Sequence, residues 1–251
     1  MTEEEFNAKE AQIINNNFRA KREEVRKTGL VSKLPEEGKT DFGYLVFLRF
    51  DDEVRGKVEK FSEMVQMSLN NRAIVYGKQN SHQSLGDYKL TRIDSGNPLP
   101  VNDQILYDLA VTVEQARDEF VRDADSKDIP NPWTMFFNYV CNADSVILAP
   151  ASNRGNYKLI ELVSQETAKR GIDFRKTWGR HVTVSRFTAD VPPQEMIRFN
   201  QLMGGKDDEA SFSNASNDGD IHYAESINVG YFTADREKGF DLRSYQSFGF
   251  D

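Results

Sequence analysis

The chain has 251 residues and is short of several features that define common protein classes. Its single cysteine, Cys141, excludes a disulfide framework within the chain, and we interpret it as a small buried residue. No apolar run approaches the roughly 18 residues that a membrane-spanning helix needs, so we expect no membrane contact. The net charge of −8 argues against duplex DNA as a partner, because a groove for duplex nucleic acid carries a basic stripe.

Histidine is scarce too, and its distribution is informative. Of three histidines, two begin tetrads of the same form, HQSL at His82 and HVTV at His181. In extended backbone, residues two apart point to the same face, so each tetrad places an imidazole beside a hydroxyl, that of Ser84 or Thr183. The third, His222, has no hydroxyl residue two positions later, and we interpret it as structural.

The sequence before the two tetrads repeats as well. Residues 43–50 and 145–149 are apolar runs typical of buried strands. Helical patterns follow over residues 52–70 and 156–170, the second with Gly171 as its stop. The chain is therefore predicted to contain two strand-helix-strand units, each of which delivers a His-x-hydroxyl strand.

The remaining segments complete the predicted organisation, in which residues 1–40 are an N-terminal helix and linker and 41–251 one bilobed domain. The helix, over residues 2–27, is sparse in apolar residues and packs outside the domain or on a partner. Residues 204–220 are polar and predict a surface loop or a lid over the cleft. Further helices are expected over 102–124 and 192–203, and a terminal hairpin over 226–232 and 240–245.

The motifs HQSL and HVTVSRF resemble those of the two-histidine (2H) phosphoesterase superfamily, which includes bacterial LigT proteins and eukaryotic cyclic nucleotide phosphodiesterases. The resemblance covers about residues 43–250. It implies a bilobed α+β fold with helices outside, in which two antiparallel-rich sheets flank a central cleft. It also implies substrates such as 2′,3′-cyclic phosphates at RNA ends, cyclic nucleotides or 2′-5′ oligonucleotides. The first motif departs from the family, because Gly86 and Asp87 are expected to interrupt its strand early.

The chemistry of the quartet follows from its residue types. Hydrolysis of a phosphodiester needs a base for the attacking water and an acid for the leaving oxygen, and histidine suits both roles. We assign His82 as base and His181 as acid, although the reverse remains open. Ser84 and Thr183 supply donors for the charge on the non-bridging oxygens. The scheme requires no metal or other cofactor, and the scarcity of cysteine and histidine argues against a zinc site.

Strand parity extends the predicted site. Tyr88 shares parity with His82, and Phe187 shares it with His181, so both rings are expected to face the cleft and stack a base. Packing in the core is the alternative for either ring. The same parity places Arg186 on the opposite face, which favours a surface ion pair over a role in binding phosphate.

These observations predict a metal-independent phosphodiesterase acting on a small nucleotide or an RNA end, in RNA processing or in removing a nucleotide signal. The acidic N-terminus, MTEEEF, is unlike a signal peptide, so we expect a cytoplasmic protein. One alternative is a nucleotide or RNA-end binding module of the same fold without turnover. Another is an interaction protein that works through its N-terminal helix.

Overall fold

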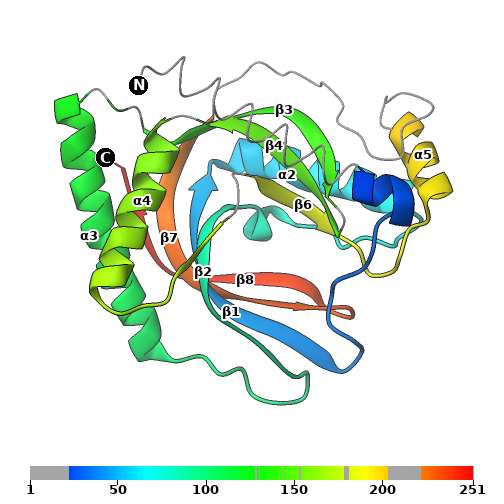
Figure 1. The fold of residues 1–251 in the computed structure, drawn as a ribbon, viewed down its shortest axis with the longest axis horizontal. Coiled ribbons are helices and arrows are strands. Elements are labelled where there is room, and N and C mark those ends of the chain that lie inside the picture. Colours follow the sequence, from blue (N-terminus) through cyan, green and yellow to red (C-terminus); the bar gives the residue numbers. More distant parts are fainter. Residues whose placement is uncertain are drawn as a thin grey trace.

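The computed structural model describes residues 23–127, 129, 131–142, 144–152, 154–177, 181–202 and 222–250. Strands and helices alternate through most of the chain, and the strands outnumber the helices (Figure 1). The strands are β1 (Lys39–Phe50), β2 (Gln83–Asp94), β3 (Trp133–Asn142), β4 (Ser145–Ser152), β5 (Arg175–Lys176), β6 (Val182–Arg186), β7 (His222–Asp235) and β8 (Gly239–Gly249). The helices are α2 (Asp52–Ser68), the short 3₁₀ helix η1 (Lys78–Asn80), α3 (Asp103–Lys127), α4 (Arg154–Lys169) and α5 (Pro193–Leu202).

All the strands belong to one antiparallel sheet, in the order β1-β2-β6-β4-β3-β7-β8, with β5 paired to β2. The sheet curls until β7 also pairs with β1. Two narrow junctions, Gln83 opposite Val182 and two residue pairs between β3 and β7, join a half with β1, β2, β7 and β8 to a half with β3, β4 and β6. The predicted α+β fold is confirmed, and the two expected sheets are the halves of this continuous sheet.

Local signals in the sequence explain where several elements begin and end. The Asp51 carboxylate caps α2 by accepting a hydrogen bond from the Val54 amide at 2.7 Å. Helix α4 ends at Lys169, and Gly171 follows with a φ of +69°, a left-handed conformation that glycine adopts without strain. The helices and strands predicted in both halves are therefore confirmed, with differences of a few residues at their ends.

Helices α2, α3, α4 and α5 pack on the outer side of the sheet. On the inner side, η1 and a smaller core around Phe47 and Phe240 lie beside the open part. Helices α3 and α4 lie side by side at one end of the molecule, and α5 lies at the other (Figure 1). Apolar residues of α3 and α4 form one core with β1, β2 and β7. A second core contains apolar residues from the C-terminal end of α2, from α5 and from β6. The inner faces of β1, β2 and β6 are thereby left to form a cleft.

The segment before β1 contributes to the second core. Val25 and Leu30 are buried in it, and Leu30 exchanges two backbone hydrogen bonds of 2.8 Å with Val191. Most of the helix predicted over 2–27 and the whole loop predicted over 204–220 lie outside the described residues. Among the helices that the structure describes, none has the length and apolar character needed to cross a membrane.

Candidate active site

Neighbouring strands bring the two tetrads together. His82 directly precedes β2 and His181 directly precedes β6, and these strands pair where Gln83 lies opposite Val182. Both histidines, with Ser84 and Thr183, line one cavity of about 450 Å³. The structure thus gathers the four predicted residues, from tetrads far apart in sequence, at a single site.

Each tetrad carries a β-bulge at the third residue after its histidine. In β2, Ser84 and Gly86 lie opposite the consecutive residues Phe47 and Val46, so Leu85 is extra. In β6, Thr183 and Ser185 lie opposite Ile147 and Val146, so Val184 is extra. A bulge inserts one residue on one strand and so reverses which face the following residues occupy. The expected early end of the first motif strand is wrong, because β2 continues through Gly86 to Asp94.

The bulges overturn three predictions that assumed regular alternation. Tyr88 lies opposite Tyr44, with ring centroids 6.3 Å apart, and packs on the core beneath α3 rather than lining the cavity. Phe187 is fully buried in the core beneath α2 and α5. Arg186, predicted on the opposite face, instead lines the cavity, and so does Asp87. Sequence parity could not reveal this, because a bulge is defined by the partner strand.

The surroundings of His82 determine its tautomer. The imidazole is 5% exposed, and its Nδ1 lies 2.6 Å from the Asn80 carbonyl oxygen. A carbonyl only accepts, so Nδ1 carries the proton and Nε2 keeps its lone pair. The Ser84 hydroxyl, 3.1 Å from Nε2, is then the donor in that hydrogen bond. The lone pair of His82 is therefore directed at the site.

Asn80 is a positioning residue that the sequence analysis missed. Its side-chain amide donates to the Phe240 carbonyl at 2.6 Å and accepts from the Leu242 amide at 3.0 Å, which ties it to β8. The ring of Phe240 stacks on the imidazole of His82, with the two ring centroids 5.7 Å apart and an interplanar angle of 10°. Asn80 stands two residues before His82, but nothing in the local sequence indicates a contact with β8.

Burial lowers the pKa of His82 to about 4. The hydrogen bond to the Asn80 carbonyl opposes this shift, and the positive charges of Arg49, His181 and Arg186 reinforce it. His82 is therefore neutral at pH 7, the state in which an imidazole can accept a proton. This favours the assignment of His82 as base.

Stability should depend on pH through His82. Its folded pKa lies below the ordinary value near 6.5, so the unfolded chain binds a proton that the folded protein does not between pH 6.5 and 4. Stability is then fully present above pH 6.5 and is lost as the pH falls toward 4. From pH 7 to 4.5, we expect urea unfolding to show a loss on the order of 2 kcal/mol greater in the wild type than in His82→Gln. Equal losses in the two proteins would contradict the buried neutral state.

Two arginines line the cavity in different states. The Arg175 guanidinium holds the Asp87 carboxylate through Nε at 3.0 Å and Nη2 at 2.8 Å. Arg186 makes no ion pair with a carboxylate of any described residue, and the nearby Tyr76, Asp144 and Asp41 raise its pKa despite burial. Of these two arginines, Arg175 is paired with a carboxylate and Arg186 is not, and Lys176 also lines the cavity.

Glycine at position 86 permits this arrangement. A Cβ there would lie 2.5 Å from the Arg175 carbonyl oxygen and 2.4 Å from the Phe174 ring, both too close for real contacts. The short strand β5 can pair with β2 only because Gly86 has no side chain. The glycine that departs from the family motif thus positions Arg175 beside Asp87.

Neither a known protein-family profile nor a curated protein sequence matches the chain. The solved structure of TT0787 from Thermus thermophilus matches it with a TM-score of 0.51 and 13% identity, over 83% of this chain and 97% of that one. The two proteins share one fold.

Other solved structures are similar to a smaller degree. E. coli LigT in apo form has a TM-score of 0.46 and 11% identity, over 83% of this chain and 97% of that one. E. coli LigT complexed with 3′-AMP has a TM-score of 0.42 and 10% identity, over 83% and 98%. The predicted LigT-like fold is confirmed as a fold by the TT0787 match.

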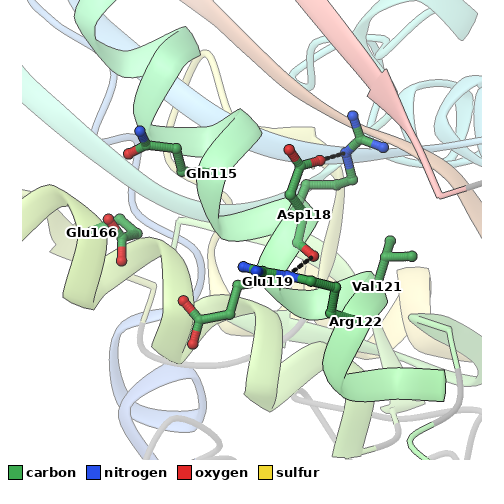
Figure 2. A pocket seen from close by; sticks show the side chains of 7 residues that line it. Gln115, Asp118, Glu119, Val121, Arg122 and Glu166 are labelled. Atoms are coloured by element: carbon green, nitrogen blue, oxygen red, sulfur yellow. Dashed lines mark hydrogen bonds and ion pairs between the residues drawn. The ribbon is translucent and has the colours of Figure 1, made fainter. Parts of the chain in front are cut away.

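A second hollow, of about 720 Å³, lies between α3 and α4 (Figure 2). It is lined by charged and polar side chains such as Glu119 and Glu166, which splay apart in Figure 2. The Asp118 carboxylate forms an ion pair with Nε of Arg117 at 3.1 Å. The Asp118 carbonyl oxygen accepts a hydrogen bond from Nε of Arg122 at 3.3 Å. Within the described part of the chain, neither hollow contains three or more histidine, cysteine or acidic residues placed to hold a metal ion.

Proposed function

We propose that this protein is a phosphodiesterase that hydrolyses a small nucleotide or RNA-end phosphodiester by acid-base catalysis with two histidines. The observation that carries the proposal is the convergence of two imidazole-hydroxyl pairs and Arg186 on one cavity. Its volume of about 450 Å³ is within the range of small-ligand sites, which favours a small substrate over structured RNA.

The reaction needs two proton transfers. As water attacks phosphorus, it gives a proton to Nε2 of His82, whose lone pair faces the site. The bond from phosphorus to the leaving oxygen breaks, and His181 in its protonated form donates a proton to that oxygen. The products are a phosphomonoester and an alcohol, and the two histidines exchange protonation states with solvent before the next turnover.

Charge on the non-bridging oxygens needs fixed donors. In the free protein the Ser84 hydroxyl donates to His82 Nε2, so substrate or the attacking water must displace that hydrogen bond. Thr183 faces the same cavity from β6, and Arg186 adds a positive charge beyond it. These groups act without a metal in the proposed mechanism.

The test is hydrolysis by the purified full chain, in EDTA, of 2′,3′-cyclic mononucleotides, cyclic dinucleotides and 2′-5′ oligoadenylates. We expect turnover of at least one class by the wild type and none by the His82→Gln/His181→Gln double variant. His222→Gln is the matched control, because His222 is buried at the start of β7 and does not line the cavity. Turnover that survives in the double variant would refute the mechanism.

A binding module without turnover is the second candidate. The depressed pKa of His82 favours it, because a base with a pKa of about 4 holds a proton weakly. This candidate predicts saturable binding of one member of the panel with no product. Product formation by the wild type excludes it.

A further inference from the structure

Four cleft residues occupy related positions around the two motif histidines. Tyr76 and Arg175 each stand six residues before a motif histidine, and Asp87 and Arg186 each stand five residues after one. All four line the cavity. The two motifs therefore supply corresponding pairs of residues at two corners of the cleft.

Each pair combines residues from both motifs. The segment that precedes one motif runs beside the strand that carries the other motif. Arg175, on β5, lies opposite Asp87 on β2. On the other side, the Ile74 amide donates to the Arg186 carbonyl at 2.8 Å, which brings residues 73–76 alongside β6. Each corner thus combines one residue before a motif with one residue after the other motif.

At the corner formed by Arg175 and Asp87, the two side chains form an ion pair with each other. The Asp87 carboxylate accepts hydrogen bonds from two nitrogens of Arg175, and it supplies the negative charge that the guanidinium requires. Donors and acceptor are matched there without any ligand.

At the corresponding corner, no carboxylate of a described residue is bonded to the Tyr76 hydroxyl or the Arg186 guanidinium. Tyr76 is 1% exposed, and its hydroxyl lies beside the Arg186 guanidinium without a hydrogen bond of regular geometry to any described residue. Burial raises its pKa to about 12, so it keeps its proton at neutral pH. The neighbouring Arg186 guanidinium can only donate, and it forms no ion pair with a described carboxylate. The charges of Asp144 and Asp41 act on Arg186 from nearby without forming an ion pair. Buried polar groups are normally hydrogen-bonded, so an anion bound at this corner would supply the acceptor that both donors lack.

We propose that Tyr76 and Arg186 form an anion subsite that binds a non-bridging phosphoryl oxygen of the substrate, in the role that Asp87 plays at the other corner. Arg186 is the next cavity-lining residue of β6 after Thr183, so a phosphoryl group at the quartet extends toward this corner. The rings of Tyr76 and Phe240 are stacked with centroids 4.7 Å apart, and Phe240 in turn stacks on His82. This stack fixes the position of the Tyr76 hydroxyl relative to the imidazole of His82. The inference rests on the proposed function and names its phosphate contact.

The experiment compares wild type, Tyr76→Phe and Tyr88→Phe as full-length proteins. Inorganic phosphate binding is measured by calorimetry, and kcat/KM on any diester that the wild type hydrolyses. Phenylalanine keeps the stack on Phe240 and removes only the hydroxyl, so we expect roughly 10- to 100-fold weaker phosphate binding and a similar loss of kcat/KM. Tyr88→Phe makes the same change on the opposite face of β2, and we expect it to behave as the wild type.

Each result is decisive. Phosphate affinity of Tyr76→Phe equal to that of the wild type, or no phosphate binding by the wild type, overturns the subsite. If Tyr76→Phe fails to fold, Arg186→Gln takes its place, and retained phosphate affinity in that variant overturns the subsite. If the wild type binds phosphate and Tyr76→Phe does not, while no diester is hydrolysed, the subsite is supported and the proposed catalysis fails.

Discussion

Replacing His82 or His181 with glutamine is expected to lower kcat by roughly 10²- to 10⁴-fold, the usual contribution of a positioned acid or base. His82 is enclosed and neutral, and the hydrogen bond from its Nδ1 to the Asn80 carbonyl leaves the Nε2 lone pair toward the cavity. Glutamine retains hydrogen bonding and volume but transfers no proton. The measurement is steady-state kinetics on the substrate identified from the panel.

The double variant supplies a second criterion. Groups that act in one step are not additive, so removing both histidines should cost little more than removing one. His222→Gln should retain wild-type kinetics. Losses that simply multiply would argue that the two histidines act in separate steps, and a loss below about tenfold in either single variant would exclude that residue as acid or base.

Replacing Arg186 with methionine is expected to lower kcat/KM by roughly 10²- to 10³-fold, because the variant loses a cavity cation, the next cavity-lining residue after Thr183 on β6, that has no carboxylate partner among the described residues. Arg186→Lys keeps the charge but loses the planar fork, and should recover part of the activity. Because Arg186 is buried, salt screens its charge only weakly, so the loss should change little as ionic strength rises.

The control removes the same charge elsewhere. The Arg243 side chain is 65% exposed on β8 and pairs with Asp241, so Arg243→Met should have kinetics close to the wild type. If both variants lose activity equally, the effect comes from net charge rather than from the position of Arg186. If Arg186→Met is fully active, the cleft does not use this cation.

The sequence alone was sufficient to place most elements and to single out the quartet. Capping at Asp51, a glycine after α4 and apolar runs are local signals, and they act over a few residues. The two tetrads could be matched because a histidine and a hydroxyl two positions apart share a face without any knowledge of the partner strands. Their meeting at one cavity was an expectation from the family resemblance, and the structure shows it.

Only the tertiary structure decided which neighbours of the quartet face the substrate. The bulges at Leu85 and Val184 arise from the register of β2 on β1 and of β6 on β4, and that register depends on residues far away in the chain. They reversed the predicted faces of Tyr88, Phe187 and Arg186. The position of Tyr76 beside Arg186 likewise depends on distant segments, because residues 73–76, which precede the first motif, run alongside β6 of the second motif. No local propensity encodes such a contact.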